Sequence, residues 1–222
     1  MTTFDVLNLS DGAFPTGAHG HSGGLEYAIQ AGWVNERASF TAWCRSALET
    51  TTMPLEVRAA LKAWYAGGRQ DVLDLWAELN AEVAAFRTSR TQREASAQVG
   101  RSFLRSVASC YGECTDSLPR ASDLDAVQFP VAWGAVFHVL GLPVQAMVET
   151  LIFGVVRQWT QVAMRIIPLG QRDAFSAQTE VLAELKPLNI GEDVLRPLSS
   201  WAPGLELSSL GMDNLERKYF RS

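Results

Sequence analysis

The sequence predicts an all-α protein, a single-domain bundle of about eight to ten helices that spans residues 1–222. Apolar residues recur at the helical spacing of three and four positions from one end of the chain to the other. No run of four to eight residues alternates apolar and polar side chains with β-branched content, as a strand would. A chain of 222 residues with 47% hydrophobic residues is long enough to bury a substantial core. We therefore expect helices packed on helices around one core.

After a short apolar opener, the chain enters a glycine-rich stretch, residues 11–26. This stretch holds five glycines and one proline in sixteen residues, too many for the interior of a helix or strand. It therefore predicts a shaped loop. Apolar residues from Leu25 onward take up the helical spacing, so a helix is expected to follow. Ser22 is expected to be its N-cap, Glu26 to lie in its first turn, and Gly32 to end it.

The rest of the chain shows the same pattern of apolar stripes separated by breakers. Further helices are expected at residues 39–52, 54–67, 72–86, 88–104, 129–140, 143–167 and 173–186, with a surface loop at 110–124 and an irregular proline-punctuated region at 187–203. Ser39 is expected to cap the first of these helices. Pro54 and Pro143 are expected at the first positions of their helices, and Pro168 at the end of the long one.

Composition excludes several classes of protein. A net charge of −5 and a pI of about 5.3 do not resemble the basic footprint of a nucleic-acid binder. Three cysteines without a paired pattern argue for ordinary thiols in a reducing compartment, so we expect a cytoplasmic protein without disulfides. No signal peptide is visible. The longest apolar region, residues 140–167, contains charged residues and is interpreted as a buried helix rather than a membrane span.

One motif matches a serine hydrolase. Residues 20–24 read G-x-S-x-G, the nucleophile elbow, which needs a strand before the serine. Pro15-Thr16-Gly17 stands there instead, and the later histidine that a triad needs is His138, on an apolar helix face. We therefore interpret Ser22 as a cap or loop hydrogen-bonder; labelling by a fluorophosphonate probe would show the hydrolase alternative.

Two histidines in the same loop are candidate metal ligands. His19 and His21 carry imidazoles, which suit nickel, copper and zinc. Two ligands make an incomplete site unless a carboxylate such as Asp11 or Glu26 joins them. The other interpretation is that the histidines are hydrogen-bonded within the loop. There is no G-x-x-x-x-G-K-[ST] motif, so a P-loop nucleotide hydrolase is excluded, and no cofactor is expected.

Motifs in a fixed order give the chain a resemblance to the urease accessory protein UreF family. They are Asp11-Gly-Ala-Phe-Pro15-Thr-Gly17, Ser22-Gly-Gly24-Leu25-Glu26, Ala31-Gly32-Trp33-Val34, Arg93-Glu94-Ala95-Ser96, Gly100-Arg101-Ser102-Phe103-Leu104, Phe129-Pro130-Val131 with Gly134, Arg165-Ile-Ile-Pro168-Leu169-Gly170-Gln171, and the close Lys218-Tyr219-Phe220-Arg221-Ser222. The chain departs from the family pattern at His19, where an aromatic residue is usual, and at Met212, where a histidine is frequent. Lys218-Tyr219 replaces Arg-Leu.

The resemblance implies an all-α, cytoplasmic, dimeric protein that is not an enzyme. It implies an adaptor that joins a UreD/UreH-type accessory protein to the GTPase UreG and helps deliver nickel to apo-urease. The residues expected to form a partner-docking or metal-transit surface are Asp11, Pro15, Gly17, Ser22, Gly24, Glu26, Arg165, Gln171, Tyr219, Phe220 and Arg221. Glu26→Ala is expected to leave the fold intact. The alternative function is a stand-alone nickel carrier that uses His19, His21 and Glu26.

The C-terminal stretch, residues 205–222, is too apolar for a solvated tail. Its apolar anchors are Leu210, Met212, Leu215, Tyr219 and Phe220. Arg217, Lys218 and Arg221 add positive charge to an acidic chain. We expect the tail to dock on a partner protein, with the anchors buried and the charges setting the register. The alternative is that the tail folds back and its two aromatic side chains fill a groove on its own domain.

The aromatic content and one segment of small residues suggest self-association. The chain has seven tryptophans and ten phenylalanines, some of which are expected at an interface. Small residues within 95–100 would let another backbone approach closely. Together they predict a homodimer in solution.

Overall fold

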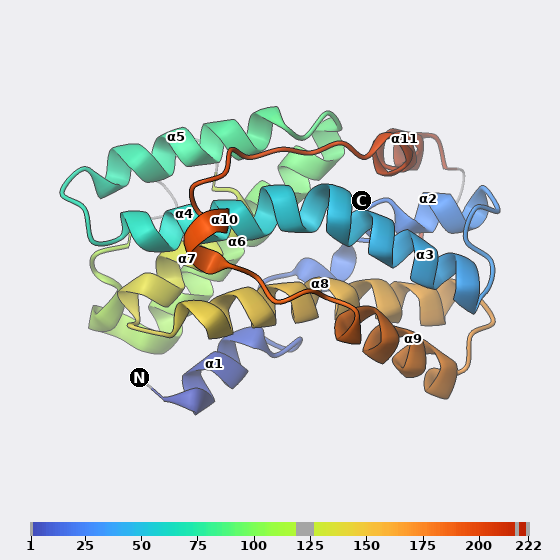
Figure 1. Ribbon diagram of the computed structural model, residues 1–222, viewed down its shortest axis with the longest axis horizontal. Helices are drawn as coiled ribbons and strands as arrows, with labels where there is room; N and C mark the ends of the chain where they lie inside the picture. The colour runs from blue at the N-terminus through green and yellow to red at the C-terminus, as the bar shows by residue number, and fades with distance from the viewer. Residues whose placement is uncertain (1, 119–126, 216–217, 221–222) are drawn as a thin grey trace.

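The structure, a computed structural model, describes residues 2–118, 127–215 and 218–220, apart from the side chains of His19 and Asp213 (Figure 1). The helices are α1 (Thr3–Ser10), α2 (Leu25–Gln30), α3 (Arg37–Ala47), α4 (Arg58–Ala66), α5 (Val72–Ala85), α6 (Arg90–Tyr111), α7 (Phe129–Val139), α8 (Val144–Ile166), α9 (Gln171–Ala183), α10 (Ile190–Asp193) and α11 (Pro203–Gly211), with short 3₁₀ turns η1 (Ala18–Gly20), η3 (Gly112–Thr115) and η4 (Met212–Asn214) and a π-helix η2 (Leu48–Val57). The described residues contain no strand, and the predicted all-α bundle is confirmed.

Two long helical rods lie side by side, and other helices of the bundle pack on them. One is α3, η2 and α4 in direct continuation, and the other is α8, which runs beside it across the molecule in Figure 1. Because α3 and α4 belong to one rod, the eleven α segments make ten separate α-helices in the described ranges, within the predicted number. The helix α5 packs on α4, and α9 packs on α3 and α8.

The helix α7 forms the centre of the core. Every residue from 130 to 137 is buried, and α7 packs most extensively on α4 and α6. Gly134 makes this approach possible, because a Cβ there would lie 2.1 Å from the carbonyl oxygen of Ala60. Gly100 does the same on α6, where a Cβ would lie 2.2 Å from the carbonyl oxygen of Val127. The small residues that suggested a dimer interface therefore admit a segment of the same chain.

The predicted break at Pro54 is wrong. Pro54 lies inside the rod, in the π-helix η2. The carbonyl of Thr50, also in η2, accepts a hydrogen bond from the backbone N–H of Trp201 at 3.1 Å, and the carbonyl of Pro54 accepts one from Ser199 at 3.1 Å. A segment from the far end of the chain thus bonds to backbone carbonyls of the helix that runs through Pro54.

Two predicted N-caps are also wrong. The N-cap of α3 is Glu36. Ser39 is the third residue of the helix, and its hydroxyl accepts a hydrogen bond from the backbone N–H of Glu36 at 3.1 Å. The N-cap of α2 is Gly24, at φ 88°, a conformation that favours glycine. Ser22 is instead fully buried two residues earlier. The surface loop expected at 110–124 begins later, because α6 runs to Tyr111 and η3 follows; residues 119–124 lie outside the described ranges.

One hydrophobic core cluster extends from Val6 in α1 to Phe220 near the C-terminus. The two ends of the described chain thus contribute to the same core. None of the helices in the described ranges has the length and apolar character needed to cross a membrane.

Candidate functional site

A buried carboxylate joins the start of the chain to its end. Glu26, in the first turn of α2, is 0% exposed. Its two oxygens accept the backbone N–H groups of Tyr219 at 2.7 Å and Phe220 at 3.0 Å. The side-chain amide of Gln30 donates a third hydrogen bond at 3.1 Å. A buried carboxylate needs such donors, so Glu26 acts as a clamp on the C-terminal tail.

The two aromatic side chains held by the clamp differ in burial. Phe220 is buried, with the guanidinium carbon of Arg165 5.5 Å from its ring centroid. Tyr219 keeps its side chain exposed. Phe220 therefore packs on its own domain, as the alternative prediction for the tail has it. The ring of Tyr219 does not, and remains accessible to a partner. Arg217 and Arg221 lie outside the described residues.

The helix α11 is turned with its two serines inward and two of its three leucines outward; the third, Leu205, is half-buried and packs against the core. Ser208 and Ser209 are 0% and 2% exposed, and they share the inner face with Met212. Leu207 and Leu210, one turn apart, are 59% and 48% exposed. Soluble helices normally bury the apolar face, so this orientation is the reverse of the usual one.

Small residues explain how α11 packs on α2. A Cβ at Gly24 would lie 2.9 Å from the Ser209 hydroxyl oxygen, and one at Gly211 would lie 2.3 Å from the ring of Tyr27. Both buried serines are hydrogen-bonded: the Ser208 hydroxyl donates to the carbonyl of Gly204 at 2.7 Å, and the Ser209 hydroxyl accepts from the side chain of Gln92 on α6. Ser22 donates to the sulfur of Met212 at 3.8 Å.

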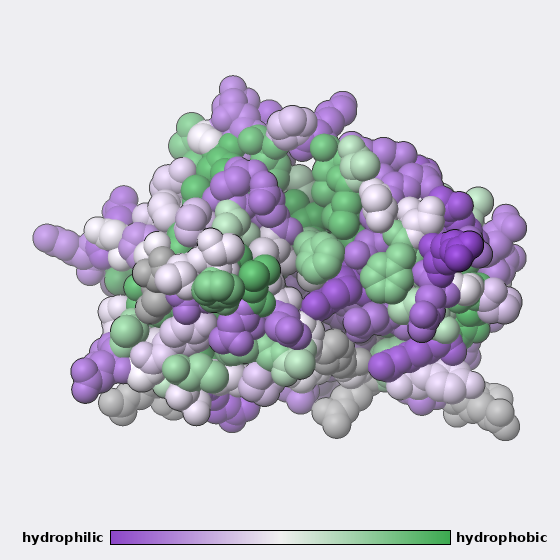
Figure 2. All heavy atoms as spheres, turned by 90° about the horizontal axis from the view of Figure 1, so that it is seen from below, coloured by the Kyte–Doolittle hydropathy of each residue, from purple (hydrophilic) through white to green (hydrophobic). Residues whose placement is uncertain are grey.

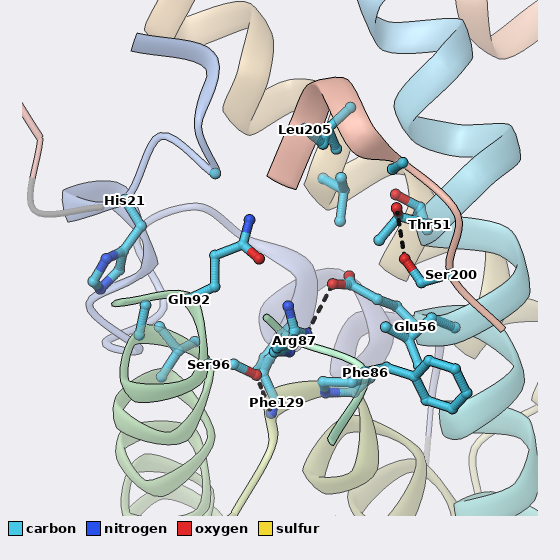
Figure 3. A pocket seen from close by; sticks show the side chains of 18 of the residues that line it. His21, Thr51, Glu56, Phe86, Arg87, Gln92, Ser96, Phe129, Ser200 and Leu205 are labelled. Atoms are coloured by element: carbon cyan, nitrogen blue, oxygen red, sulfur yellow. Dashed lines mark hydrogen bonds and ion pairs between the residues drawn. The ribbon is translucent and has the colours of Figure 1, made fainter. Parts of the chain in front are cut away.

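A partly open cavity of about 180 Å³ lies beside this arrangement (Figure 3). Its wall combines the first loop, the π-helix η2, the residues just after α5, the first half of α6, the start of α7, α8, and the segment that leads into α11 with the start of that helix. Figure 3 shows Glu56 paired with Arg87 in this wall, with an Nη2 to Oε1 distance of 2.9 Å. No sequence motif indicates this cavity; the one local signal is the unusual polarity of residues 88–98, which include Gln92 and Ser96.

The comparisons with known proteins agree with one another. The UreF family model matches residues 34–182. The chain is 32% identical over 203 residues to the urease accessory protein UreF of Azorhizobium caulinodans, covering 91% of this chain and 82% of that protein. It is 30% identical over 231 residues to that of Paenarthrobacter aurescens, covering 98% and 96%. The chain belongs to the UreF family.

Six of the residues singled out from the UreF signature come together in the structure. Ser22, Gly24, Glu26, Arg165, Tyr219 and Phe220 line the contact between α2, α8, α11 and the tail. Glu26 is in the interior, so any docking role that it has acts through the tail it holds. The sequence predicted that these residues lie on a surface. In the structure four of them, Ser22, Gly24, Glu26 and Phe220, are buried where these elements meet.

The other signature residues lie elsewhere. The carboxylate of Asp11 accepts the N–H of Ala13 at 2.7 Å, within the loop. The carbonyl of Pro15 accepts the hydroxyl of Ser106 at 2.8 Å, which fixes the loop on α6, and Gly17 has φ 75°. Gln171 is exposed at the start of α9. In the described part of the chain these residues lie apart from the clamp, and their docking role stays a prediction.

The histidine pair gives no metal centre that the structure describes. The side chain of His19 lies outside the described residues, and His21 is buried with its carbonyl accepting the amide of Gln158 at 2.5 Å. Among the side chains that are described, no three or more of His, Cys, Asp and Glu form a group that could hold a metal ion. Cys44 is buried, which raises the pKa of its thiol and keeps it neutral.

Proposed function

We propose that this UreF-family protein is a non-enzymatic adaptor in urease maturation in the cytoplasm. In this role it binds a UreD/UreH-type accessory protein and the UreG-type GTPase, and the assembly delivers nickel to apo-urease. Membership of the family supports the general role, since the relatives are named urease accessory proteins. The specific partners are the proposal.

The observation that carries the proposal is the reversed orientation of α11. Leu207 and Leu210 face outward on one side of the helix, and the exposed rings of Trp201 and Tyr219 flank it in the chain. The apolar surface of these two leucines stays exposed to water when the chain folds. It can be buried only when a partner protein covers it. Aromatic and leucine side chains are suitable anchors for such a contact. We assign this surface, defined by Trp201, Leu207, Leu210 and Tyr219, to the UreD/UreH-type protein.

A homodimer needs a second surface, and the opposite side of the molecule supplies apolar side chains for it. Figure 2 shows hydrophobic side chains gathered in the middle of the face that carries α1, α8 and α9. Exposed apolar residues of these helices are Phe4, Leu7, Phe153 and Phe175. Figure 1 places α1 and α11 on opposite sides of the bundle, so different partners can occupy the two surfaces at once. We assign this second face to the other copy in the homodimer.

Co-purification tests the assignment of α11. The double variant Leu207→Lys, Leu210→Lys places two charges on the proposed contact without altering the core, so the melting temperature should stay near that of the wild type. It should lose co-purification with the UreD/UreH-type protein. The matched control is Leu73→Lys, Leu195→Lys, which makes the same change at two leucines exposed on α5 and after α10.

The control should co-purify as the wild type does. Normal co-purification of the α11 double variant would show that this surface does not dock the partner. If the isolated protein binds nickel tightly and stoichiometrically and forms no complex with the partner proteins, it is a nickel carrier rather than an adaptor.

A further inference from the structure

The cavity beside α11 has the size and lining of a small-molecule site. A volume of about 180 Å³ exceeds the roughly 150 Å³ apolar cavity that is known to bind benzene in another protein. Its wall is mainly apolar and comes from seven different parts of the chain. The apolar lining side chains are Leu55, Phe86, Val99, Phe129, Val155, Trp159 and Leu205. One ring of benzene size with a small substituent fits such a space.

Two hydroxyls supply a polar point in this wall. Thr51 Oγ1 and Ser200 Oγ lie 3.2 Å apart, one from η2 and one from the segment before α11 (Figure 3). Each hydroxyl has one donor and two acceptor sites, so the bond between them uses only part of their capacity. A bound molecule can donate to one oxygen or accept from the other hydrogen. The pair therefore fixes the orientation of a ligand that has a single hydrogen-bonding group.

The charged groups of the wall disfavour an anionic ligand. Arg87 and Glu56 already pair at 2.9 Å and are mostly buried, so together they are neutral. Glu206, at the α11 side of the wall, opposes an anion. An added anion would lose its hydration without gaining an uncompensated cationic partner.

The π-helix η2 is a second, independent sign of a binding site. Such helical turns are rare and are found frequently at functional sites. Here η2 contributes Thr51, Thr52, Leu55 and Glu56 to the wall. The hydrogen bonds from Ser199 and Trp201 to η2 place Ser200 directly against it. The wide turn and the segment beside it thus build the cavity together.

From these features we propose that the cavity binds a neutral organic molecule of one-ring size with a single hydrogen-bonding group. The apolar wall takes the ring, and the Thr51–Ser200 pair takes the polar group. A bound molecule contacts both η2 and the segment that carries Ser200, so it should slow hydrogen exchange of the Ser199 and Trp201 amides. This binding is a property of the chain alone and does not depend on the adaptor role.

The test is a titration of the ¹⁵N-labelled full chain with phenol, followed by NMR. Phenol is neutral at pH 7 and has one hydroxyl on a benzene ring. We expect saturable shifts at the amides of Val99, Ser200 and Leu205, and slower exchange at Ser199 and Trp201. Toluene, which lacks the hydroxyl, should bind about 2- to 10-fold more weakly. Benzoate, which adds a charge to the same ring, should bind more weakly than toluene.

Three variants locate the site. Ala95→Leu adds bulk at a half-buried wall position and should abolish phenol binding while the chain stays folded. Thr51→Val removes one hydroxyl without changing the shape and should weaken phenol about 2- to 10-fold, but not toluene. Thr50→Val is the matched control, because its hydroxyl donates to the Ser46 carbonyl at 2.6 Å and lies outside the wall. It should bind phenol as the wild type does.

The proposal is overturned by any of three results. These are no saturable phenol binding by the folded wild-type chain, benzoate binding as tight as phenol, and unchanged phenol binding by Ala95→Leu. Melting curves of each variant establish that the compared chains are folded.

Discussion

Replacing Glu26 by glutamine should release the C-terminal tail without unfolding the bundle. The side chain keeps its size, but one of its two acceptor oxygens becomes an NH₂ donor. In the wild type both oxygens accept backbone N–H groups, from Tyr219 at 2.7 Å and Phe220 at 3.0 Å. In the variant one of these N–H groups faces another donor, inside a site where Glu26 is 0% exposed. Glutamine is a cleaner change than alanine, which would also open a cavity at this buried position.

The magnitude follows from the bond that is lost. A hydrogen bond to a charged group contributes about 1.5–3 kcal/mol to stability. If this hydrogen bond stabilises only the attachment of the tail, its loss shifts the equilibrium between attached and detached tail toward the detached state by roughly 10- to 100-fold. Hydrogen exchange of the Tyr219 and Phe220 amides should accelerate by that factor. Amides of α7, at the centre of the core, should keep their protection, because α7 packs most extensively on α4 and α6 rather than on the tail.

A matched control is Glu94→Gln, which removes the same charge at an exposed position on α6 paired with Arg90. It should leave the exchange of Tyr219 and Phe220 at the wild-type rate. If Glu26→Gln also leaves these two amides at the wild-type rate, the carboxylate does not hold the tail and the clamp interpretation fails. If the exchange accelerates but partner binding is unchanged, the tail is held by Glu26 but does not serve docking.

Three further predictions concern the core, the thiols and self-association. Gly134→Ala should lower the free energy of unfolding, measured in urea, by about 1–3 kcal/mol or more, because the new Cβ would lie 2.1 Å from the backbone oxygen of Ala60; an unchanged midpoint would contradict this. A thiol reagent should modify exposed Cys110 and Cys114 in the native protein and reach Cys44 only on unfolding, since burial raises the pKa of Cys44; rapid reaction of all three thiols would contradict the packing of α3. Light scattering at micromolar concentration should give a dimer, and a mass near the monomer value of 24.3 kDa, with or without the partner protein, would count against it.

Local signals in the sequence determined most helix boundaries. The helix predicted at 143–167 is observed as Val144–Ile166, and the one predicted at 72–86 as Val72–Ala85. Proline and the apolar period act within one or two turns, so they can be read without knowing the fold. Pro54 shows where this fails. There the helix continues through the proline as a π-helix, and its carbonyls at Thr50 and Pro54 accept the N–H groups of Trp201 and Ser199 from far along the chain.

The sequence also identified the motifs of the UreF family, but only the tertiary structure decided what their residues do. Glu26 at a helix start is expected to be solvated, yet its partners Tyr219 and Phe220 lie 193 and 194 positions further along the chain. The outward leucines of α11 depend on Gly24, which lets the serines approach α2. The cavity depends on seven segments meeting at one place. Each of these features is a contact between distant parts of the chain, and the energy of such a contact depends on where packing brings the two groups, which no local pattern of residues specifies.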